Sequence, residues 1–314
     1  MQRRVLVLLS TYNGIKYLRE QIESILAQEQ VEVSILIRDD GSTDNTKQLL
    51  NDYCSKYNNI SLIASSDNLR PGNSFMELIY YAGQDCFEKY DYYALADQDD
   101  IWLKNKLFCA IKKIEDSKDT AQPILYCSNQ ILYKNEKECG VRYIHAPRID
   151  LPSVINSNKV SGCTFVMNKC LLMKICSAPH PSRKLMLRRM HDVWIVLAAI
   201  CSGELIYDNK SYILYRIHEN NVVGIKRTSM IERMRIYCKN LSDKEYGNYR
   251  SWTASEIKHA FPEVKGKNRE ILEELSGYRK SIKLKKKLLC DYDTLRKIDN
   301  GAFAAVLKIL FNVL

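Results

Sequence analysis

The sequence is short of glycine and proline, has no long apolar run and lacks paired cysteines. Its 314 residues include 12 glycines and 7 prolines, and no segment reaches the roughly 18–20 apolar residues that a membrane-spanning helix needs. The 11 cysteines are scattered without a CxxC pair, which argues against a disulfide framework and a zinc site. We therefore expect reduced thiols in a cytoplasmic protein.

The amino terminus lacks the features of a signal peptide. Residues 1–10, MQRRVLVLLS, hold five apolar residues in a row, too short a run for the apolar stretch of a signal sequence. The polar residues TYNG follow directly. The run predicts a buried first strand.

The positive charge is concentrated at one end of the chain. Residues 226–314 contain 20 Lys and Arg against 11 Asp and Glu, a net charge of +9 out of the chain's +10. Such a basic region suggests an anionic partner, either a membrane surface or a nucleic acid. The region has few interleaved aromatic residues and no recognised nucleic-acid module, which argues against a nucleic acid.

The first hundred residues alternate between strand and helix patterns. The apolar runs at 4–10, 31–38, 60–66 and 90–96 predict strands, and residues 11–28, 46–57 and 72–84 have helical spacing between them. This order predicts an α/β fold with a doubly wound, mostly parallel sheet flanked by helices. We place a domain boundary near residue 225, with an α/β domain at 1–225 and a helical basic extension at 226–314.

Polar clusters follow the first two predicted strands. In parallel sheets ligands bind beyond the carboxyl ends of strands, so STYNG (10–14) and RDDGSTDNT (38–46) are candidate site segments. The first suits a phosphate or pocket turn, but it equally suits a helix cap. The second suits contacts to a nucleoside, but it is also ordinary turn chemistry.

The acidic cluster ADQDD (96–100) ends the fourth predicted strand. Asp97 and Asp99 alternate, so an extended segment would turn both to one side. Such a carboxylate pair suits Mg²⁺ or Mn²⁺, which would hold a diphosphate. The alternative is a solvated acidic turn before a helix. We expect Asp100 to point the other way and to cap the helix that follows.

Two later segments carry further candidates. In MHDVW (190–194), Asp192 opens a predicted helix and is either an N-cap or a general base. In YRIHENNVVG (215–224), Arg216 and His218 share one face of an extended segment. A lone histidine is more often structural, but a metal or phosphate contact is plausible here.

Taken in order, these segments resemble a known enzyme family. STYNG, RDDGSTDNT, ADQDD and HDVW are similar to the nucleotide-binding turn, the nucleoside-binding acids, the DxD motif and the catalytic-base motif of family 2 glycosyltransferases with the GT-A fold. The resemblance covers about residues 1–225. ADQDDIW, SGCTFVMN, HDVW and YRIHENNVVG look most like bacterial rhamnosyltransferases of cell-surface polysaccharide synthesis.

The resemblance implies roles for individual residues. Asp192 would be the catalytic base, and Asp99 with His218 would bind the divalent metal. The donor nucleotide would contact Thr11, Tyr12, Asn13, Asp39, Asp40 and Asp97. The sugar and acceptor would lie near Gly162, Cys163, His191, Trp194 and Arg216. Two departures are His191, where many members have an acidic residue, and Arg70, where many have Gly.

The implied reaction is an inverting, metal-dependent sugar transfer. The sugar would pass from a nucleoside diphosphate donor to a saccharide or lipid-linked acceptor. The preferred sugar is rhamnose, with dTDP-rhamnose as its donor. Residues 280–290 and 303–314 look like interfacial helices, which suggests peripheral contact with the inner face of the plasma membrane or an oligomer contact. Two alternatives remain. One is a nucleotidyltransferase, although LLSTYNG lacks the Gly-rich basic loop of that class. The other is a non-catalytic nucleic-acid-binding protein.

Overall fold

The chain divides into two compact units. The computed structural model describes residues 2–63, 65, 67–218, 248–299 and 301–314. The first unit comprises Met1–Pro147 and Val160–His218, and the second comprises Arg148–Lys159 and the chain from Glu219 onward. The boundary predicted near residue 225 lies outside the described residues.

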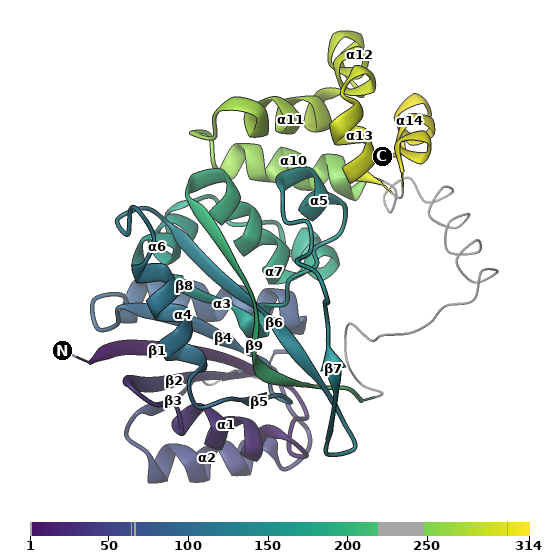
Figure 1. Cartoon of the computed structure of the whole chain (residues 1–314). Helices are drawn as coiled ribbons and strands as arrows, with labels where there is room; N and C mark the ends of the chain where they lie inside the picture. The colour runs from purple at the N-terminus through teal and green to yellow at the C-terminus, as the bar shows by residue number, and fades with distance from the viewer. Residues whose placement is uncertain (1, 64, 66, 219–247, 300) are drawn as a thin grey trace. The chain divides into compact units, whose positions relative to one another are not determined.

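The first unit begins with four strands joined by helices, as the sequence predicts (Figure 1). The elements are β1 (Arg3–Thr11), α1 (Leu18–Leu26), β2 (Val31–Asp39), α2 (Thr46–Lys56), β3 (Ile60–Ile63), α3 (Arg70–Tyr81), a π-helical turn (Ala82–Cys86) and β4 (Tyr92–Ala96). The strands pair in parallel in the order β3-β2-β1-β4. The α/β fold with a mostly parallel sheet flanked by helices is confirmed.

The second half of this unit extends the same sheet. Its elements are β5 (Ile101–Trp102), α4 (Lys106–Glu115), β6 (Ile124–Lys134), β7 (Lys137–Val141), a 3₁₀ turn (Gly162–Thr164), β8 (Val166–Asn168), α6 (Lys169–Ser177), α7 (Arg183–Ser202) and β9 (Glu204–Arg216). The order continues β4-β8-β6-β9-β5, with β7 on β6. β8 pairs antiparallel to both neighbours, and β6 pairs parallel to β9.

The core explains why the first strand is a continuous apolar run. Val5, Val7 and Leu9 pack in one core cluster with buried residues of α1, α2 and α4. Leu6 and Leu8 alternate to the opposite side of the strand and are also buried. A parallel strand covered on both faces needs apolar residues at every position.

The described part of the C-terminal region, residues 248–299 and 301–314, is helical, as predicted. The second unit contains α5 (Leu151–Asn156), α10 (Tyr249–Ala260), α11 (Gly266–Gly277), α12 (Ile282–Cys290), α13 (Tyr292–Ile298) and α14 (Ala302–Leu310). Arg250 Nη2 donates to Asn156 Oδ1 at 2.8 Å, and Lys297 Nζ lies 3.0 Å from Asp150 Oδ2. These contacts attach α5 to the C-terminal helices. Among the described helices, none combines the length and the apolar character that crossing a bilayer requires.

Candidate active site

Three turns lie at one edge of the parallel sheet. They are the β1 turn (residues 11–14), the β2 turn (residues 39–46) and the β4 turn (residues 97–100), each following a strand. Because β2, β1 and β4 are parallel neighbours, their carboxyl ends share this edge. The three polar segments that the sequence separates by dozens of residues are therefore adjacent.

The β1 turn connects the other two turns. Thr11 is buried, and its Oγ1 donates to Gln98 Oε1 in the β4 turn at 2.7 Å. Asn13 has a φ of 48°, in the left-handed region, and its Oδ1 accepts from Thr43 N in the β2 turn at 2.8 Å. The Tyr12 side chain is 45% exposed, so its ring is accessible to a ligand.

The acids of the β2 turn are held by groups of the protein itself. Asp40 accepts hydrogen bonds from Arg38 Nη1 and from the backbone N–H of Leu69 and Arg70, both at 2.9 Å. Asp39 Oδ2 accepts from the backbone N–H of Ser42 at 3.0 Å. Both acids are buried. Their predicted contacts with a nucleoside stay a prediction.

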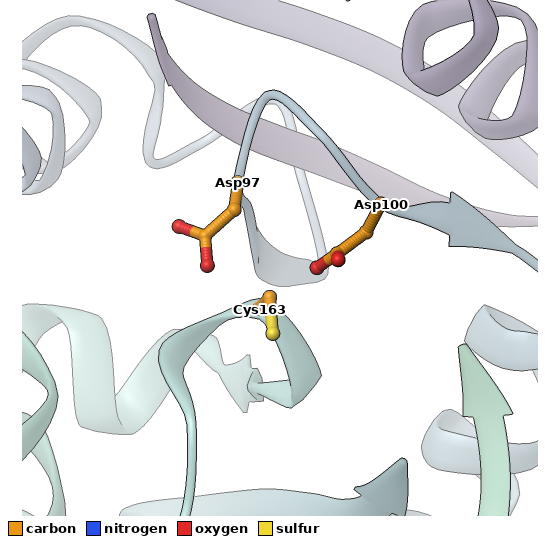
Figure 2. Close-up of side chains that lie close together, drawn as sticks. All are labelled: Asp97, Asp100 and Cys163. Carbon is orange, nitrogen blue, oxygen red and sulfur yellow. The ribbon is translucent and has the colours of Figure 1, made fainter. Parts of the chain in front are cut away.

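The β4 turn brings two carboxyl groups against a thiol (Figure 2). The ligand atoms of Asp97, Asp100 and Cys163 all lie within 4.8 Å of one another. Burial raises the pKa of Asp97 to about 7, with further contributions from Asp99 and Asp192. Burial and the same crowding raise the pKa of Asp100 well above its usual range.

The expectation for Asp100 is wrong on both points. Its side chain turns into the Asp97 cluster rather than away, and its Oδ1 accepts from Arg216 N at 3.1 Å. Its Oδ2 has no hydrogen-bond partner among the described residues. The next helix, α4, begins at Lys106, because β5 comes between the acids and that helix. The alternation argument failed because residues 97–100 form a turn and not an extended segment.

Asp99 of the β4 turn lies against His218. His218 Nε2 lies 2.8 Å from Asp99 Oδ2, and the side chains are 17% and 16% exposed. The His218 ring stacks on Tyr17 at a centroid distance of 5.2 Å. A carboxylate oxygen beside an imidazole nitrogen, both partly open, fits a divalent cation such as Mn²⁺. The metal-binding role of this pair stays a prediction.

The segment around Gly162 faces a buried histidine. A Cβ atom on Gly162 would lie 2.7 Å from His191 Nε2, so a side chain there would collide with the ring. His191 stacks on Phe75 at 4.1 Å, and neither ring nitrogen finds a hydrogen-bond partner within the described part of the chain. Burial lowers the pKa of His191 to about 3, so the ring is neutral at physiological pH. Gly162, Cys163 and His191 are thus grouped beside the β4 turn.

Asp192 lies where α7 is interrupted. Met190 has φ 65° and ψ 162°, which breaks the helix just before His191. Asp192 therefore begins a new helical segment and accepts from Val193 N at 2.8 Å. Its charge contributes to the raised pKa of Asp97, which places the two acids in the same electrostatic environment. The site thus contains a half-buried carboxylate separate from those of the β4 turn.

Two predicted sugar or acceptor residues have mainly internal contacts. Trp194 is 2% exposed and belongs to the core. Arg216 Nε donates to Asp99 O at 2.9 Å, and its guanidinium pairs with Glu20 and lies over the Tyr17 ring. These contacts hold the β4 turn, and a role toward sugar or acceptor stays a prediction for both residues.

Sequence reasoning missed Gln98 and Lys106. Gln98 joins the β1 and β4 turns, but nothing in the sequence sets it apart from a solvated turn residue. Lys106 is 1% exposed, its Nζ lies 3.7 Å from the centre of the Trp102 ring, and burial lowers its pKa to about 7. The helical spacing of α4 could have indicated that Lys106 is buried, because Lys106 lies four residues before the buried Ala110 on the same face of the helix.

The comparison with protein families decides what these residues belong to. The sequence model described as glycosyl transferase family 2 matches residues 6–174, which include the three turns. The chain belongs to this family. Family membership makes the protein a glycosyltransferase, in place of the nucleotidyltransferase or nucleic-acid-binding protein that the sequence left open.

A relative supports this family assignment, and two solved structures share the fold. The chain is 32% identical over 225 residues to the dTDP-rhamnosyl transferase RfbG of Shigella flexneri, covering 69% of this chain and 73% of RfbG. The crystal structure of S. aureus TarS 1–349 in complex with UDP-GlcNAc has a TM-score of 0.59 at 17% identity, covering 97% of this chain and 84% of that one. The mannosyltransferase PcManGT from Pyrobaculum calidifontis, in complex with GDP-Man and Mn²⁺, has a TM-score of 0.52 at 12% identity, covering 99% and 88%. These two likenesses concern the fold, and this family 2 glycosyltransferase shares the GT-A architecture.

Proposed function

We propose that the protein transfers a sugar from a nucleoside diphosphate donor to an acceptor hydroxyl with inversion. The observation that carries this proposal is the gathering of Asp97, Asp99 with His218, and Asp192 around the carboxyl ends of parallel strands. The similarity to RfbG makes dTDP-rhamnose the preferred donor. The acceptor is a saccharide or a lipid-linked saccharide of bacterial surface polysaccharide synthesis.

The donor occupies the edge formed by the three turns. Tyr12 offers an exposed ring, and Thr11, Asn13 and the β2 turn form the floor beneath the nucleoside. The diphosphate approaches the β4 turn, where Asp99 and His218 would hold Mg²⁺ or Mn²⁺. When bound, a divalent cation there supplies charge neutralisation for the leaving diphosphate.

Asp192 is the general base of the transfer. It accepts the proton of the acceptor hydroxyl as the oxygen attacks the anomeric carbon, and the bond to the diphosphate oxygen breaks on the opposite face. A half-buried carboxylate at the start of a helical segment is held in one orientation, which favours the in-line geometry. Gly162 and the neutral ring of His191 line the region in which the donor sugar lies.

The experiment that tests this function combines a donor panel with one substitution. Wild-type protein is incubated with dTDP-rhamnose, UDP-GlcNAc or GDP-mannose and Mn²⁺, and nucleoside diphosphate release is measured with and without a saccharide acceptor. Asp192→Asn should lower the acceptor-dependent rate about 10³-fold while leaving donor affinity within about twofold. Near-normal transfer by Asp192→Asn would show that another group takes the proton.

We also propose peripheral membrane contact through α12 and α14. Phe303 in α14 and Phe311 directly after it are 78% and 74% exposed, and helical spacing places both away from the buried Ala305 and Ile309. Lys285 Nζ, in α12, donates to Leu310 O at 3.2 Å, so the lysine-rich helix lies beside this apolar stripe. Lysines around exposed aromatic rings suit an anionic lipid surface, where each Lys adds about 1 kcal/mol.

Liposome flotation tests this contact. The full chain should float with vesicles containing anionic lipid, and Phe303→Ser with Phe311→Ser should abolish flotation. Tyr292→Ser, which removes a 65% exposed aromatic ring from α13, is the matched control and should float normally. Loss of self-association without any lipid binding would instead assign this surface to an oligomer.

A further inference from the structure

Gln98 links the β1 turn to the β4 turn. Its Oε1 accepts hydrogen bonds from Thr11 Oγ1 at 2.7 Å and from Tyr12 N at 2.9 Å. Its Nε2 donates to Tyr12 O at 3.2 Å. One carboxamide therefore binds both backbone polar groups of Tyr12, and a shift of either turn along the sheet edge would break these bonds.

Gly14 leaves the space in which the carboxamide sits. A Cβ atom at residue 14 would lie 2.4 Å from Gln98 Oε1 and 2.6 Å from Thr11 Oγ1, closer than real contacts allow. Any side chain at this position would push the Gln98 carboxamide away from Tyr12. The β1 turn is thus shaped to receive this side chain.

The acids of the β4 turn have separate anchors on their other side. Arg216 donates to Asp99 O and to Asp100 Oδ1, and His218 Nε2 lies 2.8 Å from Asp99 Oδ2. These contacts come from the end of β9 and do not involve Gln98. Removing the Gln98 side chain would therefore leave the acids in place but free the β1 turn from them.

We propose that Gln98 is a positioning residue that fixes the β1 turn relative to the acids of the β4 turn. The nucleoside binds at Tyr12 and the diphosphate binds near Asp97 and Asp99, so one ligand must span both turns. A fixed separation lets the donor bind without ordering the turns first. The inference rests on the proposed function, because it takes the two turns as the nucleoside and diphosphate contacts.

Calorimetric titrations separate this role from a general loosening of the fold. Wild type, Gln98→Ala and Gln98→Met are titrated with dTDP in the presence of Mn²⁺, and separately with Mn²⁺ alone. We expect both variants to bind dTDP about tenfold more weakly, since the three hydrogen bonds between the turns are lost. Mn²⁺ alone should bind within about twofold of wild type, because the Arg216 and His218 anchors remain.

Gly14→Ala tests the same contact from the opposite turn. It should weaken dTDP binding by about the same factor, and Gly14→Ala with Gln98→Ala should be no weaker than the worse single variant, because both changes break one contact. Gln48→Ala is the matched control: it removes an exposed glutamine on α2 that bonds Asp52 Oδ1 at 2.9 Å. Its dTDP affinity should equal that of wild type.

Each other result has a defined meaning. Wild-type dTDP affinity in Gln98→Ala and Gln98→Met overturns the positioning role and leaves the proposed function intact. An equal loss of Mn²⁺ and dTDP affinity in these variants also overturns it, since it indicates general disorder of the site. If wild-type protein binds none of dTDP, UDP and GDP with Mn²⁺, the proposed function and this inference fall together.

Discussion

The two acidic turns at the sheet edge differ in how their carboxylates are held. In the β2 turn, Asp40 accepts from a buried guanidinium and two backbone amides, and Asp39 accepts from Ser42. In the β4 turn, Asp97 and Asp100 face each other across Cys163, and Asp100 Oδ2 has no partner among the described residues. The carboxylates of the β2 turn thus have hydrogen-bond partners, whereas Asp100 of the β4 turn has an oxygen without one among the described residues.

This difference indicates different roles for the acids of the two turns. The β2 turn supplies its own positive charge through Arg38, so its negative charge is balanced in the folded chain. Crowded, buried acids of the β4 turn have raised pKa values, which means that their ionised forms are unfavourable without an added positive group. We infer that the β2 turn contributes mainly to stability and the β4 turn mainly to function.

Asp99→Asn should produce the largest effect and should affect activity alone. Losing this carboxylate removes a proposed metal ligand, and we expect kcat/KM for transfer to fall about 10³-fold. Folding stability without metal should stay the same or rise, because the Asp99 charge that helps to raise the pKa of Asp97 and of Asp100 disappears. Transfer assays and urea unfolding in a chelator measure the two quantities. A loss of more than about 2 kcal/mol in the free energy of unfolding would contradict the assignment.

Asp40→Asn should produce the converse result. It leaves the Arg38 guanidinium, whose side chain is 5% exposed, without its carboxylate, and we expect a loss of about 3 kcal/mol in unfolding free energy. Asp52→Asn, an exposed acid on α2, is the control and should change stability by less than about 0.5 kcal/mol. Unaltered stability in Asp40→Asn would place the β2 turn in the same class as the β4 turn.

His191 extends the comparison to a histidine whose ring nitrogens have no hydrogen-bond partner among the residues that the structure describes. Burial lowers the folded pKa to about 3, below the usual 6.5, so between these values the unfolded chain binds the extra proton. The contribution of His191 to stability is therefore complete above about pH 6.5 and falls as pH decreases toward 3, with about 2 kcal/mol lost at pH 5, whereas the raised pKa of Asp97 gives a contribution of opposite sign over this range.

Urea unfolding at pH 7.5 and pH 5 tests this histidine. The change in unfolding free energy from pH 7.5 to pH 5 should be about 2 kcal/mol more favourable in His191→Gln than in wild type, because glutamine does not titrate. His145→Gln, which replaces an exposed histidine, should keep the wild-type difference. An unchanged difference in His191→Gln would mean that other groups cause the acid sensitivity.

The sequence predicted the strands and the acids that follow them, but not which partners those acids have. Continuous apolar runs specify β1, β2 and β4, and parallel winding brings their ends to one edge. The donors that distinguish Asp40 from Asp100 come from distant segments, the amides of 69–70 and the end of β9, and no local pattern indicates them. The predicted start of the first helix at residue 11 is wrong for a similar reason. Residues 11–14 bond to the neighbouring turns instead of forming the first helical turn, and α1 begins at Leu18.

Substitution of Arg70 has the smallest predicted effect. Its hydrogen bond to Asp40 requires a strained backbone conformation at Arg70. Its φ is 67°, in the left-handed region, and it precedes Pro71, which restricts it further. This conformation aims its N–H at Asp40 Oδ2, 2.9 Å away. Arg70→Gly should raise the unfolding free energy by about 0.5–1 kcal/mol, the relief of the left-handed backbone less the extra freedom of glycine when unfolded.

Arg70→Ala separates the backbone from the side chain. Alanine has the same backbone restriction as arginine, so this variant should gain no stability, and urea unfolding of both variants measures the difference. An equal gain in Arg70→Ala would assign the strain to the arginine side chain. A gain confined to Arg70→Gly would assign the strain to the backbone. The chain would then tolerate a strained residue because its N–H completes the hydrogen bonds of Asp40. No such constraint applies to Asp100 in the β4 turn.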